Sequence, residues 1–240
     1  INDFKSALGK ISDFSDDAVI SLSIRNEVSS HSCPAKLAEM VLAHESFKLL
    51  IETSGIGWRK DEVEKILAMD SSRITWIIDL DALDKNLYKS LRGEGYEEAY
   101  KFASEMVSKS LNNVWVQAVR MNENEEDNEH FYKYWKEHTK NVIIQKYDWC
   151  CGKLEQRKVT DLSPVKRLPC WHIKREMAIL SDGRVPLCRD DLEGEYILGN
   201  FFKDYISAIW ENGMKYYRQH LDEEYPGLCR NCDEYYTYNY

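Results

Sequence analysis

Hydrophobic and polar positions follow two alternating periods along the first two-thirds of this chain. Short apolar-rich runs predict strands, and the segments between them repeat apolar residues three or four positions apart, as helices do. The predicted strands are residues 18–24, 47–51, 73–78, 114–119 and 142–144. The predicted helices are residues 34–44, 61–69, 95–108 and 125–138. Pro34 stands at the first position of its helix, where a missing N–H costs nothing.

Strands and helices that alternate at this spacing indicate right-handed βαβ units and a parallel sheet. About five such units fit, fewer than the eight of a closed barrel. The sequence therefore predicts an α/β fold, a partial TIM-like (β/α) barrel or an open sheet. In such folds the functional side chains lie at the carboxyl ends of the strands.

The pattern changes after about Asp161. Residues 177–180 and 185–187 flank an Asp182-Gly183 pair, which predicts a β-hairpin. Residues 201–217 predict one or two further helices. We therefore expect a partial barrel over residues 1–161 and a small cysteine-rich domain over residues 162–240.

Composition narrows the class of protein. The chain has 240 residues, 43% of them hydrophobic, and a net charge of -9. That charge argues against a nucleic-acid partner, because phosphate binding needs clustered Lys and Arg. No apolar run approaches the roughly 20 residues of a membrane span, and the first residues do not resemble a signal peptide. We expect a cytoplasmic protein without a membrane or nucleic-acid partner.

Seven cysteines are too few for a disulfide scaffold, and their number is odd. In a reducing compartment, clustered thiols favour a metal. Cys229 and Cys232 lie three apart, so one tight turn can direct both at the same ion. Cys170 and Cys188 bracket the predicted hairpin. Four such thiolates fit a tetrahedral site for either zinc or an iron–sulfur cluster, which spacing alone does not separate.

The same region resembles a known family. Twelve residues separate Cys170 from Gly183 and four separate Gly183 from Cys188, as in the SPASM and twitch domains of radical SAM enzymes. Leu-Gly-Asn at 198–200, Ile-Trp-Glu-Asn-Gly at 209–213 and the final Cys-Arg-Asn-Cys extend the resemblance. It implies one auxiliary 4Fe-4S cluster held by Cys170, Cys188, Cys229 and Cys232, in the shorter twitch arrangement. A cluster with all its irons bound by cysteine suits electron transfer.

The other cysteines do not complete the family pattern. Radical SAM enzymes carry C-x-x-x-C-x-x-C after the first strand, but here Cys33 stands alone and Cys150 and Cys151 are adjacent. We read Cys150 and Cys151 as structural or incidental. We expect either the later part of a longer radical SAM protein, similar to spirochaete proteins of the SPASM type, or a protein that has lost the radical cluster. In both cases this chain alone performs no radical chemistry.

The first two-thirds resembles the later barrel strands of the same family. Glu27 matches the glutamate of the family's Gly-Gly-Glu-Pro segment, and Thr53-Ser54-Gly55 resembles its Thr-Asn-Gly. The resemblance implies that residues at strand ends contact S-adenosylmethionine or substrate: Glu27, Asp79, Arg92, Gln117, Arg120 and Asn122. As alternatives, Glu27 is a loop carboxylate, and Arg92 and Arg120 are structural ion-pair residues.

Asp190 follows Cys188 by two residues and is a candidate proton acceptor near substrate, with a polar turn as the alternative. The resemblance implies a radical SAM oxidoreductase or maturase in the full-length protein. Such an enzyme cleaves S-adenosylmethionine and takes a hydrogen from a peptide or small-molecule, sugar-type substrate. It receives electrons from a reducing partner such as flavodoxin or ferredoxin. The competing interpretation is a zinc-stabilised binding or scaffold module without catalysis.

Overall fold

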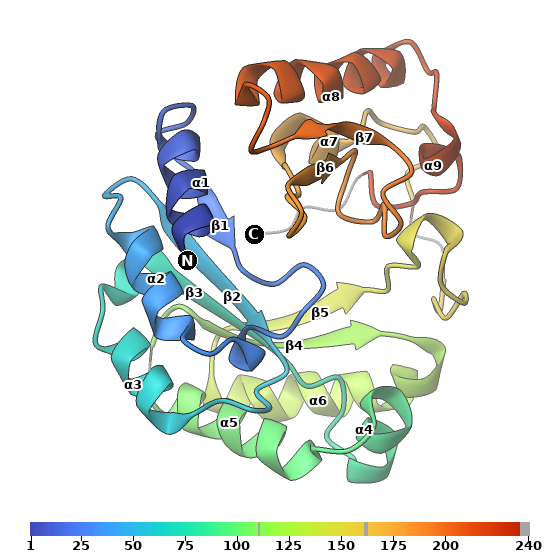
Figure 1. Ribbon diagram of the computed structural model, residues 1–240. Helices are drawn as coiled ribbons and strands as arrows, with labels where there is room; N and C mark the ends of the chain where they lie inside the picture. The colour runs from blue at the N-terminus through green and yellow to red at the C-terminus, as the bar shows by residue number, and fades with distance from the viewer. Residues whose placement is uncertain (110, 161–162, 236–240) are drawn as a thin grey trace. The chain divides into compact units, whose positions relative to one another are not determined.

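The computed structural model describes residues 1–109, 111–160 and 163–235 (Figure 1). The chain forms two compact units, residues 1–147 and 148–240. The boundary expected between residues 161 and 162 falls outside the described ranges. Residues 148–160 belong to the second unit, which places Cys150 and Cys151 in the same unit as the four motif cysteines.

The first unit is built on a five-stranded sheet in the order β1-β2-β3-β4-β5, with every neighbouring pair parallel (Figure 1). This confirms the predicted α/β fold with about five units of a partial barrel. The strands are β1 Val19–Ser21, β2 Lys48–Thr53, β3 Ile74–Asp79, β4 Val114–Arg120 and β5 Val142–Lys146. Because all five run the same way, their carboxyl ends share one edge of the sheet.

Helix α1 Asn2–Ser12 precedes β1. The helices that connect the strands are α2 Pro34–Leu42, α3 Lys60–Leu67, α4 Lys85–Arg92, α5 Tyr96–Ser108 and α6 Glu125–His138. The 3-10 turns of this unit are η1 Val28–Ser30, η2 Ser71–Arg73 and η3 Asn122–Asn124. Two helices, α1 and α4, were not predicted. α4 is capped by Asp84, whose carboxylate accepts a hydrogen bond of 2.8 Å from the Leu87 N–H, a start signal that sequence reading could have used.

The core of the first unit lies between the sheet and these helices. Alternate residues of β2 are buried, including Leu49, Ile51 and Thr53. Trp76 of β3 and Trp135 of α6 are among the largest fully buried side chains. The register pairs Asp79 of β3 with Gln117 of β4. Because this core holds the strands in register, the polar side chains of Asp79 and Gln117 lie next to each other at the carboxyl ends of β3 and β4.

The second unit is small and contains η4 Cys150–Gly152, α7 Trp171–Arg175, β6 Arg184–Pro186, β7 Ile197–Asn200, α8 Ile206–Leu221 and α9 Gly227–Arg230. The predicted turn at Asp182-Gly183 forms, with the Gly183 N–H donating to the Leu180 carbonyl at 2.8 Å. The predicted strand at residues 177–180 is wrong, because the antiparallel partner of β6 is β7. The second arm of the hairpin is the Leu-Gly-Asn segment.

One contact between β7 and α8 explains two of the sequence motifs, Leu-Gly-Asn and Ile-Trp-Glu-Asn-Gly. A Cβ on Gly199 would lie 2.9 Å from Cγ1 of Ile209, so only glycine lets the strand approach the helix this closely. The Asn212 side-chain amide donates to the Leu198 carbonyl at 2.8 Å. Leu-Gly-Asn and Ile-Trp-Glu-Asn-Gly are therefore the two halves of a single packing site.

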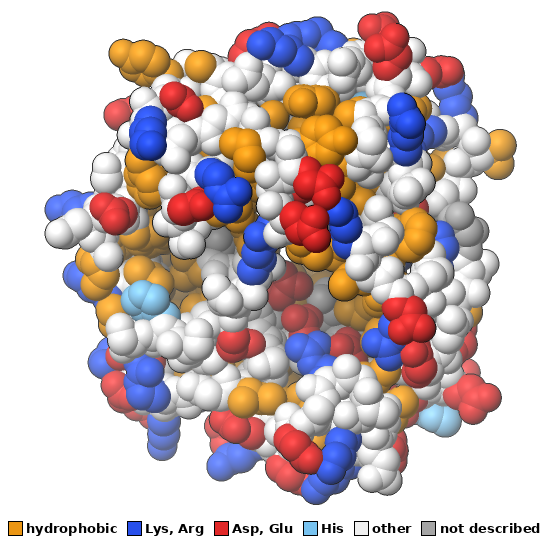
Figure 2. Space-filling model, turned by 45° about the vertical axis from the view of Figure 1, so that its right-hand side comes forward, with side chains coloured by type: hydrophobic (Ala, Val, Ile, Leu, Met, Phe, Trp, Pro, Cys, Tyr) orange, Lys and Arg blue, Asp and Glu red, His pale blue; other side chains and the backbone are white. Residues whose placement is uncertain are grey.

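Basic and acidic side chains are interspersed on the face drawn in Figure 2, alongside scattered apolar ones. Within the described ranges, each helix is too short or too polar to cross a lipid bilayer.

Candidate metal centre

The four motif cysteines gather in a buried cluster of the second unit. Cys170 and Cys229 are each 6% exposed, and Cys188 and Cys232 pack against the same cluster. The apolar residues of this cluster include Ile173, Leu187, Leu228 and Tyr235. The thiols are therefore collected in a largely dry environment.

The position of each cysteine is set by a nearby helix, strand or turn. Cys170 directly precedes α7, and its N–H donates to Nδ1 of the buried His220 at 3.3 Å. Cys188 follows β6, and Cys229 lies in the short α9. The Cys232 N–H donates to the Cys229 carbonyl at 3.2 Å, which closes the Cys-Arg-Asn-Cys turn.

The pKa values of two of these thiols, Cys170 and Cys229, reflect their burial and the thiols around them. Burial raises the pKa of Cys170 to about 12, and the thiols of Cys232 and Cys188 contribute to the rise. Burial, followed by Cys188, Cys232 and Cys170, likewise raises the pKa of Cys229. Mutual effects of this kind require the sulfurs to lie near one another. Two sequence-distant pairs of cysteines therefore meet in one place.

The side chain of Arg167 lies beside this cluster. The Arg167 guanidinium donates to the backbone carbonyls of Cys229 and Arg230, the latter at 3.3 Å. It lies over the ring of Tyr225 at 4.0 Å and over that of Tyr235 at 4.8 Å. Stacking between two aromatic rings holds the arginine in place. Its charge favours an anionic metal–thiolate group at this site.

The donor set fits a thiolate-bound metal. Soft sulfur ligands in apolar surroundings suit an iron–sulfur cluster or zinc, whereas magnesium and calcium require oxygen ligands. Cys170, Cys188, Cys229 and Cys232 would hold such a group.

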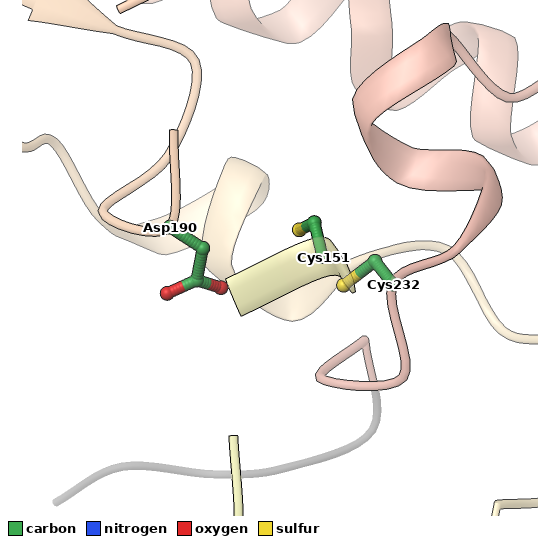
Figure 3. Close-up of side chains that lie close together, drawn as sticks. All are labelled: Cys151, Asp190 and Cys232. Carbon is green, nitrogen blue, oxygen red and sulfur yellow. The ribbon is translucent and has the colours of Figure 1, made fainter. Parts of the chain in front are cut away.

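A fifth thiol, Cys151, belongs to the same buried cluster. It contacts the thiols of Cys188 and Cys232, and those contacts raise its pKa above the ordinary value. Its sulfur, that of Cys232 and a carboxylate oxygen of Asp190 all lie within 4.8 Å of one another (Figure 3). The interpretation of Cys151 as structural or incidental did not anticipate this placement, because sequence spacing did not connect it to the motif.

Asp190 is 5% exposed and lies at the edge of this thiol cluster. Burial, followed by the nearby Asp148, raises the pKa of Asp190 to about 7. The neighbouring Asp191 stabilises the turn, because its carboxylate accepts hydrogen bonds from the backbone N–H groups of Glu195 and Tyr196, both at 2.9 Å. The two adjacent aspartates therefore have different environments.

In the first unit, Glu27 binds the segment that follows β2. Its carboxylate accepts from the Ser54 N–H at 2.8 Å, from the Ser54 hydroxyl at 2.7 Å and from the Thr53 hydroxyl. Glu27 therefore fixes the Thr-Ser-Gly turn. Gly55 in that turn has φ +80°, and a Cβ there would lie 2.9 Å from Phe102.

Asp79 and Gln117 are brought together at the carboxyl ends of β3 and β4. The Gln117 side-chain amide donates to Asp79 at 2.8 Å and reaches Glu52 at 3.4 Å. Burial, together with the Glu52 carboxylate, raises the pKa of Asp79 well above its ordinary value, and Arg92 opposes the shift. This is a carboxylate-rich site that could accept hydrogen bonds or a positive charge.

The two predicted arginines are both in ion pairs. Arg92 donates to Asp81 at 2.6 Å, and the Asp81 side chain is 5% exposed. Arg120 donates to Glu125 at 2.7 Å. These pairs correspond to the structural alternative weighed for both arginines.

Asn122, the last of the sequence candidates, begins η3 and is exposed. The structure thus joins Asp79 to Gln117 directly and places Arg92 close enough to affect Asp79. Sequence reading missed Glu52 and Asp81. Both could have been found in the sequence, because each is a charged residue that interrupts an apolar run near the end of a strand.

Comparison with known proteins supports this reading of the second unit. Residues 170–233 match the SPASM family, described as an iron–sulfur cluster-binding domain. Streptococcus suis SuiB bound to precursor peptide SuiA is similar in fold, with a TM-score of 0.72 and 15% identity over 95% of this chain and 69% of that one. Native anSMEcpe with bound AdoMet gives a TM-score of 0.64 and 13% identity over 88% of this chain and 72% of that one.

The chain carries a SPASM domain, has the fold of SuiB and anSMEcpe, and belongs to one family with a protein of Treponema pallidum. Among individual proteins, it is 41% identical to an uncharacterized protein of Treponema pallidum strain Nichols. That match covers 244 aligned residues, 96% of this chain and 68% of the Treponema protein.

Proposed function

We propose that this chain supplies the auxiliary-cluster domain and the cofactor-facing strand ends of a radical SAM oxidoreductase or maturase. The observation that carries the proposal is the meeting of Cys170, Cys188, Cys229 and Cys232 in one buried cluster within the SPASM match. Four thiolates are the ligand set of a 4Fe-4S cluster.

A 4Fe-4S cluster bound here would supply one-electron transfer. The protein's own part is to exclude water and to set the charge around the sulfurs. Ile173, Leu187 and Leu228 provide the apolar surroundings. Arg167 adds a fixed positive charge beside Cys229. Both features tune the reduction potential of a bound cluster.

The strand ends of the first unit suit S-adenosylmethionine, which carries an ammonium group, a sulfonium and ribose hydroxyls. The carboxylates of Glu27, Glu52 and Asp79 could accept these groups, and Gln117 orients Asp79. Glu27 has spare acceptor capacity, because among the described residues its Oε1 atom accepts from the Thr53 hydroxyl alone. We propose that Arg92, Arg120 and Asn122 contact the cofactor only at the rim of that site, where they could donate to its carboxylate or ribose hydroxyls, since both arginines are already paired.

For the substrate, we propose a peptide or a sugar-type small molecule. SuiB was solved with a precursor peptide, which favours the peptide. Asp190, buried beside the thiols, would accept a proton from that substrate. A flavodoxin or ferredoxin in the cytoplasm would supply the electrons.

The experiment is metal analysis of protein purified and reconstituted without oxygen. We expect about four irons and four sulfides per chain and broad absorbance near roughly 400 nm. The same measurement on Cys170→Ala serves as the control and should show loss of the cluster. One zinc per chain, no colour and no uptake of iron would instead establish the zinc-stabilised scaffold, which the S4 donor set also fits.

A second measurement concerns the reaction itself. None of the 240 residues form a C-x-x-x-C-x-x-C segment, and three such thiolates hold the cluster that cleaves S-adenosylmethionine in this family. We therefore expect this chain, reconstituted and reduced with dithionite, to bind S-adenosylmethionine without producing 5′-deoxyadenosine. Calorimetry and mass spectrometry measure the two halves of this expectation, and 5′-deoxyadenosine in the product mixture would contradict it.

A further inference from the structure

The metal centre contains one thiol more than a cluster needs. A 4Fe-4S cluster takes four cysteine ligands, and the SPASM match supplies Cys170, Cys188, Cys229 and Cys232. Cys151 is a fifth member of the same buried cluster, and it is 8% exposed. It lies outside residues 170–233, so the family match does not assign it a role.

Cys151 is directed at two of the motif thiols. It contacts the thiols of Cys188 and Cys232. The Cys151 and Cys232 sulfurs lie within 4.8 Å of each other, and Figure 3 shows the two side chains approaching from different segments of the chain. Iron prefers a thiolate to the hard carboxylate of Asp190, which lies in the same group.

An unusual turn sets this direction. Cys150, Cys151 and Gly152 have consecutive φ values of +51°, +57° and +89°. The left-handed conformation costs a residue other than glycine roughly 1–2 kcal/mol. The turn is held by the Cys150 N–H, which donates to Asp148 at 2.8 Å, and by the Leu154 N–H, which donates to the Trp149 carbonyl at 3.1 Å.

Because of this turn, the adjacent side chains of Cys150 and Cys151 have different neighbours. Both sulfurs lie within 4.8 Å of an Asp190 carboxylate oxygen, but the other member of the group is the Cys232 thiol for Cys151 and the Asp148 carboxylate for Cys150. Cys150 is therefore a matched control for Cys151, with the same side chain at the next position.

We propose that Cys151 is an exchangeable fifth ligand of the auxiliary cluster, able to replace Cys232 on its iron. The proposal rests on the proposed function, since it requires a cluster at this site. In the exchange, the Fe–S bond to Cys232 breaks and a bond from iron to Cys151 forms. The proton of the Cys151 thiol passes to the departing Cys232 thiolate, and no electron is gained or lost. The site keeps its cluster while one ligand is away.

The test compares variants reconstituted without oxygen: C151A, C232A, C150A/C232A and C151A/C232A. Iron and sulfide are counted, and the reduced clusters are compared by electron paramagnetic resonance. We expect C151A and C232A each to hold about four irons, and C151A/C232A to fall to about three or fewer. C150A/C232A should match C232A. Resonance spectra of C232A and the wild type should differ, because one ligand has changed.

The outcomes separate the two proposals. A wild-type protein that takes up no iron overturns the proposed function. If the wild type holds about four irons but C232A holds as little iron as C151A/C232A, the result overturns only the ligand exchange proposed for Cys151. About four irons in C151A/C232A would also overturn the ligand exchange. If C232A does not fold, as judged by circular dichroism, the same comparison is made with C232V, whose side chain fills the space of the thiol without binding iron.

Discussion

The backbone N–H of Ser54 donates a hydrogen bond of 2.8 Å to the carboxylate of Glu27. With the Ser54 and Thr53 hydroxyls, three donors converge on this one side chain. The turn at the carboxyl end of β2 is therefore fixed by a residue 26 positions earlier. A carboxylate held in this way is already oriented before any ligand arrives.

Glu27→Ala should destabilise the first unit by about 1.5–3 kcal/mol, because three donors lose a charged acceptor. The measurement is the free energy of unfolding in urea. Glu125→Ala serves as the control, since the Glu125 side chain is 38% exposed and its pair with Arg120 should be worth about 1 kcal/mol or less. Equal losses in the two variants would show that the Glu27 contacts do not stabilise the turn.

Arg92→Ala should destabilise by about 3 kcal/mol, because it leaves the carboxylate of Asp81 buried without its partner. Burial lowers the pKa of Arg92, but the Asp81 and Asp79 carboxylates outweigh it and raise that pKa. The Val119 N–H donates to the Asp81 carboxylate at 2.6 Å. Replacing Asp81 with asparagine as well should recover part of the loss, since an amide oxygen can still accept that hydrogen bond. A double variant no more stable than Arg92→Ala would argue against this explanation.

Asp79→Asn should change how stability depends on pH. The folded state raises the pKa of Asp79 above 3.8, the ordinary value expected when unfolded. The folded state therefore binds the proton more tightly, and its advantage, complete below about pH 3.8, is lost as the pH rises through the folded pKa. The asparagine of the variant has no such proton to lose. Unfolding curves should show the variant more stable than wild type at about pH 7 and equal to it near about pH 3.

For the Asp79→Asn variant, Asp3→Asn at an exposed position is the control and should give parallel curves at all pH values. If Asp79→Asn is less stable than wild type at about pH 7, the carboxylate is charged and paired there, contrary to the raised pKa.

Gly183→Ala should destabilise the second unit and reduce its iron content. Gly183 has φ +82°, and a Cβ would lie 2.5 Å from Phe202. Gly152→Ala isolates the backbone cost, because Gly152 has φ +89° and a Cβ there would lie no closer than 3.8 Å to its neighbours. We expect about 1–2 kcal/mol for Gly152→Ala and more for Gly183→Ala, which adds a clash. Thermal unfolding and iron analysis measure both effects; a smaller loss for Gly183→Ala would contradict the close packing.

Removal of the metal should lower the unfolding temperature of the reconstituted protein. A ligand that binds only the folded state adds stability, about 2.7 kcal/mol at a hundredfold excess over its Kd. Calorimetric scans before and after chelation measure the shift. Cys170→Ala, which lacks one motif thiol, should lose most of that shift.

The sheet could be predicted because each strand is a separate apolar run with a helical segment after it. The same reasoning missed α4, whose start depends on the Asp84 cap, and it paired β6 with the adjacent residues 177–180. The true partner, β7, lies beyond Cys188, and its selection depends on packing of Gly199 against α8. Pairing across such a distance is not encoded in local periodicity.

The four motif cysteines could be named from their spacing, which a tight turn and a hairpin explain. Cys151 could not, because only the left-handed turn at Cys150–Gly152 directs it towards the other thiols. The arginines show the opposite difficulty. Their positions at strand ends were predicted, but their partners Asp81 and Glu125 come from packing that the sequence does not display.

The position of β7 and α8 between Cys188 and Cys229 has a consequence for the chain as a polymer. A metal bound by both cysteines closes this segment into a covalently anchored loop, and closing a loop restricts the unfolded chain in proportion to the logarithm of its length. The centre then acts as a reversible cross-link. A protease cut between Leu221 and Pro226, where α8 has ended, would leave two fragments that stay together while the metal is bound and separate when it is removed.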